Sequence, residues 1–134
     1  MATWMVVEDE PDLYDMVLAM YETLGIDGVA FLSGEDAVNW LEDVDAGALG
    51  VDLPQLALLD IRLPGKISGT LVGARIRASQ RLGHIPIVLM TAYRLTPAQL
   101  EEALHEAGAD LLIYKPLPSL DEFQRLMHDV LARR

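Results

Sequence analysis

The sequence predicts an α/β protein whose core is a doubly wound parallel sheet of five strands. Two observations predict this fold class. Five short apolar runs alternate along the chain with five amphipathic segments, so that a helix follows each strand. Four of the five runs are almost continuously apolar, which is typical of parallel strands that are covered on both faces.

The apolar runs define where the strands are expected. The second run has a polar edge, and we therefore expect it at the margin of the sheet. The expected strands are Thr3–Val7, Gly28–Leu32, Leu56–Asp60, Ile85–Met90 and Asp110–Tyr114.

The segments between the runs carry helix start and stop signals. Pro11 suits a first helical position, and Gly25 ends that helix. Thr96 and Gln99 predict a capping box before a helix that stops at Gly108. The expected helices are Pro11 to Gly25, Gly34–Asp43 with Val38 and Leu41 on the sheet, Thr70–Leu82, Thr96 to Gly108, and one that starts at Ser119 with the buried stripe Leu120, Phe123, Leu126 and Val130. The stretch from Asp45 to Pro54 is the longest expected loop.

Composition limits the domain count and the classes of partner. The chain has 134 residues, of which 51% are hydrophobic, so we expect one domain over residues 1–134 with no output domain. A formal net charge of -11 disfavours direct binding of nucleic acid and of anionic membranes. Cysteine is absent, which excludes thiolate metal sites and a cysteine nucleophile. Since no apolar run approaches the ~18 residues of a membrane span, we expect a cytoplasmic protein.

Polar residues follow the strands at the ends where ligands bind in open α/β sheets. Glu8 and Asp9 follow the first expected strand, and Asp60 ends the third. Thr91 follows the fourth strand and Lys115 the fifth. Each alone has a plain structural explanation as a cap or a surface charge, but all five are expected at one edge of one sheet.

A crowded set of carboxylates must hold a proton or a cation. Two carboxylates ~4 Å apart repel by about 4 kcal/mol at an effective dielectric constant of ~20. A helix terminus offers only ~0.3–1 kcal/mol to a nearby anion, and Lys115 offsets part of the rest. We therefore expect either a raised carboxyl pKa or a bound divalent cation. Oxygen ligands favour Mg²⁺ (or Mn²⁺). The coordination positions that the protein does not fill hold water and readily accept phosphate oxygens.

These residues resemble the receiver domains of two-component response regulators. The resemblance rests on VVEDEPD, LLDIRLPG, LMTAY, GAD and YKPL, which occur in this order and cover essentially the whole chain. It implies a flavodoxin-like (CheY-like) (βα)5 fold with strand order 2-1-3-4-5. It also implies that Asp60 is the phosphoacceptor, Asp9 a direct metal ligand and Glu8 a ligand acting largely through water.

The resemblance assigns roles to further residues. The backbone carbonyl of Arg62 is implied as another metal ligand, and Thr91 and Lys115 as partners of the phosphoryl oxygens. Pro116 matches the proline that follows a cis peptide bond in receivers. The implied function is a stand-alone regulator, not an enzyme, that accepts phosphoryl from a histidine kinase or a phosphotransfer protein. It would signal to an unidentified downstream protein, or through a homodimer, by the face of the fourth helix, fifth strand and fifth helix.

The chain departs from the receiver pattern at several positions. Receivers usually carry an aromatic residue three positions before the lysine, where this chain has Leu112, and its nearest aromatic residue is Tyr114. The stretch from Pro64 to Gly69 is one residue longer than the usual loop. Tyr93 flanks the site, and we expect it to shield the acyl phosphate from water; the dephosphorylation rate of Tyr93→Ala tests this hypothesis.

Two alternatives stay open. A pseudo-receiver would keep the fold and bind partners without phosphotransfer, and Leu112 and the longer loop leave room for it. A haloacid-dehalogenase-like phosphatase also uses a strand-end aspartate with Mg²⁺, but it needs a second aspartate two positions on. That position is Arg62, which cannot donate a proton at neutral pH.

Overall fold

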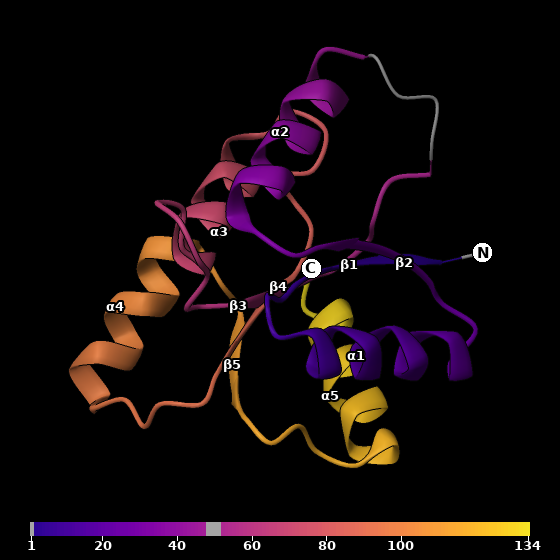
Figure 1. Cartoon of the computed structure of the whole chain (residues 1–134), viewed down its shortest axis with the longest axis vertical. Helices are drawn as coiled ribbons and strands as arrows, with labels where there is room; N and C mark the ends of the chain where they lie inside the picture. The colour runs from indigo at the N-terminus through magenta and orange to yellow at the C-terminus, as the bar shows by residue number, and fades with distance from the viewer. Residues whose placement is uncertain (1, 48–51) are drawn as a thin grey trace.

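The predicted fold class is confirmed by a computed structural model, which describes residues 2–47 and 52–134. Five parallel strands form one sheet in the order β2-β1-β3-β4-β5, and a helix follows each strand (Figure 1). The elements are β1 (Thr3–Val7), α1 (Pro11–Thr23), β2 (Asp27–Phe31), α2 (Gly34–Asp45), β3 (Ala57–Asp60), α3 (Gly69–Ala78), β4 (Ile87–Thr91), α4 (Pro97–Ala107), β5 (Leu111–Tyr114) and α5 (Leu120–Ala132).

Helices cover both faces of the sheet, with α1 and α5 on one face and α2, α3 and α4 on the other (Figure 1). Strand residues alternate between the two faces. In β1, Met5 and Val7 pack with α2 and α3, whereas Trp4 and Val6 pack with α1 and α5. Because both faces are buried, the central strands are apolar except at their ends, where Thr3, Asp60 and Thr91 lie. β2 pairs with β1 at the margin of the sheet, as its polar edge predicts.

Several expected boundaries and buried positions are wrong by a few residues. α3 ends at Ala78, because Ser79 adopts an extended backbone and its hydroxyl accepts the N–H groups of Arg81 and Leu82. α2 continues to Asp45, two residues beyond the expected Asp43, and residues 48–51 of the loop expected from Asp45 to Pro54 lie outside the described part. Differences in the buried stripes are also small. Val38, Leu120 and Leu126 are half-buried, while Ala37, Val44 and Met127 are fully buried.

Arg77 joins three segments at the end of the sheet where β4 and β5 begin. Its guanidinium donates to the carbonyl oxygens of Gly108 at 2.9 Å and Gly83 at 3.0 Å, and to that of Ile85. It also pairs with Asp110 at 3.1 Å. The same Asp110 oxygen accepts the N–H of Ile87, so one ion pair fixes the starts of two strands.

Candidate functional site

Three carboxylates meet at the carboxyl ends of β1 and β3. Val7 lies opposite Leu59 in the sheet, so the residues that follow β1 come beside Asp60. One carboxylate oxygen from each of Glu8, Asp9 and Asp60 lies within 4.8 Å of the others. Glu8 and Asp60 are 0% and 5% exposed, whereas Asp9 faces solvent. We call these three residues the acidic cluster.

Among the described residues, Lys115 is the cation that forms ion pairs with the acidic cluster. Its Nζ lies 2.6 Å from Glu8 Oε1 and 3.3 Å from Asp60 Oδ2. It directly follows β5, and the Lys115–Pro116 peptide bond is cis, as the receiver resemblance implies. One ammonium group therefore faces three carboxylates, and the site retains an excess of negative charge.

The charge imbalance appears in the pKa values of the cluster. Burial and the neighbouring Glu8 raise the pKa of Asp60 to about 7. Burial also raises the pKa of Asp9, and Glu8 adds to this effect. For Glu8, burial is outweighed by hydrogen bonds from Lys115, Asp60 and the Glu10 N–H, and its pKa falls below the usual value. The cluster is thus poised to hold a proton on Asp60 or to bind a cation with oxygen ligands.

Thr91 lies at the same end of the sheet, at the end of the neighbouring strand. Met90 pairs with Asp60, so Thr91 is one residue beyond the strand neighbour of Asp60. Its side chain is buried, its hydroxyl accepts the N–H of Tyr93 at 3.2 Å, and its carbonyl accepts the N–H of Lys115 at 2.8 Å. These bonds tie the β4–α4 connection to the end of β5.

Two cation–aromatic stacks flank the site. The Arg62 guanidinium lies 3.8 Å from the ring centroid of Tyr93, which is 52% exposed. Arg94 lies 4.8 Å from the ring centroid of Tyr114. Leu112, where receivers usually carry an aromatic residue, is half-buried and packs on the core beneath α2, α3 and α4. The aromatic residue of β5 thus contacts the β4–α4 connection through an arginine.

Sequence reasoning missed two contacts that shape the loop after Asp60. The Lys66 N–H donates to Glu35 Oε2 at 2.9 Å, and a Cβ at Gly69 would lie 1.9 Å from the Asp60 carbonyl oxygen. Glu35 and Lys66 are 31 residues apart, and no local pattern signals their contact. The Pro64-Gly65 pair is a turn signal and could have indicated the positive φ of +80° at Gly65.

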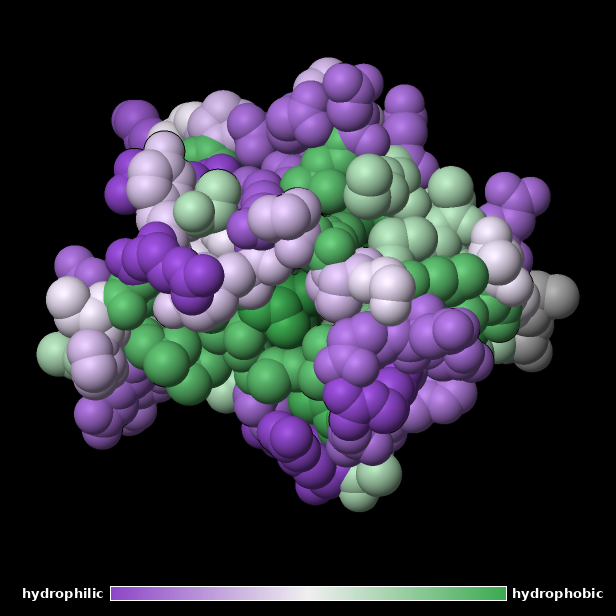
Figure 2. All heavy atoms as spheres, turned by 90° about the horizontal axis from the view of Figure 1, so that it is seen from below, coloured by the Kyte–Doolittle hydropathy of each residue, from purple (hydrophilic) through white to green (hydrophobic). Residues whose placement is uncertain are grey.

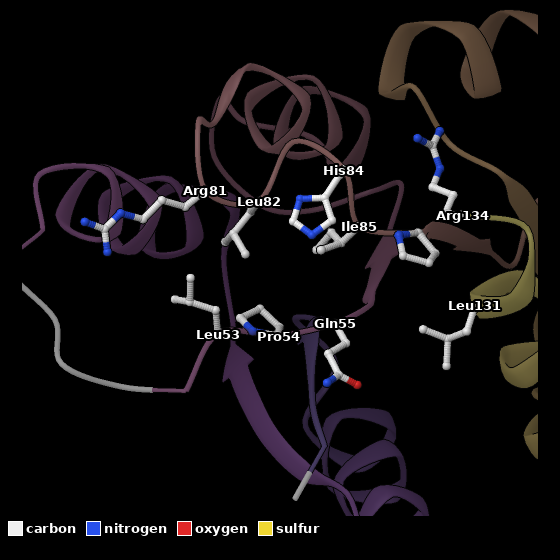
Figure 3. A pocket seen from close by; sticks show the side chains of 10 residues that line it. Leu53, Pro54, Gln55, Arg81, Leu82, His84, Ile85, Leu131 and Arg134 are labelled. Carbon is white, nitrogen blue, oxygen red and sulfur yellow. The ribbon is translucent and has the colours of Figure 1, made fainter.

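A separate cavity of about 440 Å³ lies near the opposite ends of the strands. It is formed by the segments that precede β3 and β4 and by the end of α5 (Figure 3). The lining side chains include His84 and Arg134 among leucine, isoleucine and proline residues. None of the residues of the acidic cluster lines this cavity.

A five-stranded parallel sheet with an acidic cluster and a lysine at its carboxyl edge is the arrangement expected of a signalling domain of the response regulator class. The chain belongs to the response regulator receiver domain family, whose model matches residues 4–127. Receiver domains are signalling modules that interact with histidine kinases or phosphotransfer proteins, and they are not typical enzymes. The family match supports the receiver interpretation over the phosphatase alternative.

Individual relatives agree with the family match. The probable methanogenesis regulatory protein FilR2 of Methanothrix harundinacea is 32% identical over 94% of this chain and 79% of its own length. The DNA-binding dual master transcriptional regulator RpaA of Synechocystis is 29% identical over 84% of this chain, which spans 42% of RpaA. The receiver domain of sensor histidine kinase PA1611 from Pseudomonas aeruginosa, solved with magnesium in its active site cleft, has a TM-score of 0.78 and 26% identity, and the match covers 98% of each chain.

Within the described residues, none of the helices is long and apolar enough to cross a membrane.

Proposed function

We propose that this chain is a response regulator receiver that accepts a phosphoryl group on Asp60 in a Mg²⁺-dependent reaction. The phosphoryl donor is a histidine kinase or a phosphotransfer protein, and the protein acts in the cytoplasm. The observation that carries the proposal is the acidic cluster, in which burial and Glu8 hold the pKa of Asp60 at about 7 while Lys115 lies 3.3 Å away.

The acidic cluster fits a divalent cation. Its three members offer oxygen atoms within 4.8 Å of one another and carry more negative charge than Lys115 balances. Glu8, Asp9, Asp60 and the backbone carbonyl of Arg62 would hold Mg²⁺ (or Mn²⁺). When bound, the ion would neutralise negative charge on the cluster and on an incoming phosphoryl group.

The chain's own residues have separate tasks in the transfer. An ionised oxygen of Asp60 attacks phosphorus in line with the leaving group, and a P–O bond forms as the P–N bond to the donor histidine breaks. The electron pair of that bond leaves with the imidazole nitrogen. Lys115 and the Thr91 hydroxyl bind oxygens of the transferred group, where negative charge is concentrated. Asp60 is partly ionised near neutral pH because its pKa is about 7.

The product changes the charge next to a surface that can contact partners. An acyl phosphate brings about -1.5 to -2 charges and new acceptor oxygens. These oxygens attract the Thr91 hydroxyl, which accepts the N–H of Tyr93. Tyr93 stacks with Arg62, and the next residue, Arg94, stacks on Tyr114 of β5. On the side of α4, β5 and α5, hydrophobic residues form a band bordered by hydrophilic ones (Figure 2). This face would contact a downstream protein or a second copy of the chain, and the net charge disfavours direct contact with nucleic acid or membrane.

Incubation with Mg²⁺ and a small phosphodonor tests the proposal. We expect the wild type to gain the mass of one phosphoryl group and Asp60→Asn to gain none, because the amide is a poor nucleophile. The matched control Asp52→Asn removes an exposed carboxylate and should be phosphorylated like the wild type. A wild type that remains unmodified would favour the pseudo-receiver, and release of inorganic phosphate over many turnovers would favour the phosphatase.

A further inference from the structure

The loop between β3 and α3, residues 61–68, is held at two places. At its end, the Gly69 N–H donates to the Ile61 carbonyl at 2.9 Å, and a Cβ at Gly69 would clash with the Asp60 carbonyl oxygen. Further along the loop, the Lys66 N–H donates to Glu35 Oε2 at 2.9 Å. Glu35 lies in the first turn of α2, on a different element from the acidic cluster. The loop therefore connects the phosphoacceptor to α2.

Two glycines allow Glu35 and the loop to approach closely. Gly65 has a φ of +80°, and a Cβ there would lie 2.5 Å from Glu35 Oε2. A Cβ at Gly34 would lie 2.3 Å from the Ile67 carbonyl oxygen. Hydrogen bonds from the backbone of Lys66 and Ile67 lower the pKa of Glu35, which is thus a charged acceptor. Glycines on both segments, Gly34 in α2 and Gly65 in the loop, therefore permit the contact between Glu35 and the loop.

We infer that Glu35 is a positioning residue for the phosphoryl site and acts through the loop between β3 and α3. The inference rests on the proposed function. The loop carries Arg62, whose carbonyl is a proposed metal ligand and whose guanidinium stacks on Tyr93 at 3.8 Å. A ligand that is already ordered loses less conformational freedom when the ion binds. The hydrogen bond from Lys66 to Glu35 fixes the loop four residues beyond that ligand.

The test compares Mg²⁺ affinity, measured by calorimetry, and the initial rate of phosphorylation by a small phosphodonor. We expect Glu35→Ala to weaken Mg²⁺ binding about tenfold, as outer residues of metal sites commonly do. Phosphorylation should be slower at low Mg²⁺ and recover at saturating Mg²⁺. Glu35→Gln keeps an acceptor oxygen and should stay close to the wild type. Glu42→Ala, which removes an exposed carboxylate from the same helix, should equal the wild type.

Gly65→Ala disrupts the same contact from the loop side. We expect its effect and that of Glu35→Ala to be non-additive, because both remove one interaction. Unchanged Mg²⁺ affinity in Glu35→Ala contradicts the inference, and so does an equal loss in Glu42→Ala, which would indicate a general charge effect. If the wild type itself binds no Mg²⁺ and takes no phosphoryl group, the proposed function is wrong and the inference falls with it. Urea unfolding in the presence of a chelator shows whether each variant is folded. If Gly65→Ala does not fold, the comparison of Mg²⁺ affinity between Glu35→Ala and Glu35→Gln tests the inference.

Discussion

Replacing Arg77 with methionine is expected to lower the free energy of unfolding by about 3 kcal/mol. The guanidinium is mostly buried and donates to three backbone carbonyls as well as to Asp110. Methionine fills similar space but offers no donor, so those carbonyls lose this partner, and the Asp110 carboxylate keeps the Ile87 N–H and Arg134. A removed partner costs more than the net value of the bonds, because the remaining polar groups stay buried.

Urea unfolding followed by circular dichroism measures this difference. Arg125→Met is the matched control, since Arg125 pairs with Glu122 on the exposed surface of α5. Exposed pairs of this kind contribute about 0–1 kcal/mol, so the control should unfold nearly like the wild type. Equal midpoints for the two variants would show that the contacts of Arg77 do not stabilise the starts of β4 and β5.

Asp60→Asn is expected to stabilise the protein in the absence of divalent ions, by an amount that depends on pH. The pKa of Asp60 is raised from 3.8 to about 7, so the folded state holds a proton that the unfolded state releases between these values. The free energy of unfolding therefore falls as pH rises through this window, and the ionised carboxylate destabilises the fold above it. Asparagine is neutral at every pH. Its advantage should be small near pH 4, grow up to about pH 7 and then level off at roughly 2–4 kcal/mol.

Thermal or urea unfolding of the two proteins across this pH range, with a chelator present, checks the prediction. The pKa of Glu8, which Lys115 and Asp60 itself lower, acts in the opposite direction, so the difference between the two proteins reports on the coupled pair. Asp52→Asn is the control for loss of an exposed carboxylate. Saturating Mg²⁺ should narrow the gap, because the ion stabilises the wild type more. A pH-independent gap would mean that Asp60 is not held in a repulsive cluster.

The fold could be predicted from sequence because burial on both faces leaves a strong local signal. The run 56–59 is apolar throughout because helices cover both sides of the strand. The end of α3 could not be predicted in the same way. It depends on the Ser79 hydroxyl, which accepts the N–H groups of Arg81 and Leu82 in place of a continued helix.

For the candidate site, the residues at strand ends could be predicted from the sequence, whereas the contacts between loops could not. Residues that end parallel strands must meet at one edge, so the proximity of Glu8, Asp60 and Lys115 follows from the topology. Contacts between loops do not. Glu35 reaches Lys66, and Arg62 stacks on Tyr93, because of the path that each loop takes between its ends. The path of a loop leaves no periodic pattern of side chains in the sequence, unlike a strand or a helix.

The number of Mn²⁺ ions bound per chain, counted by electron paramagnetic resonance, tests most directly whether the crowded carboxylates form a cation site. The account predicts one ion per chain slightly above neutral pH, displaced by Mg²⁺. It also predicts strongly weakened binding in Asp9→Asn, while Asp52→Asn binds like the wild type. Failure of the wild type to bind, or unchanged binding in Asp9→Asn, would contradict the account.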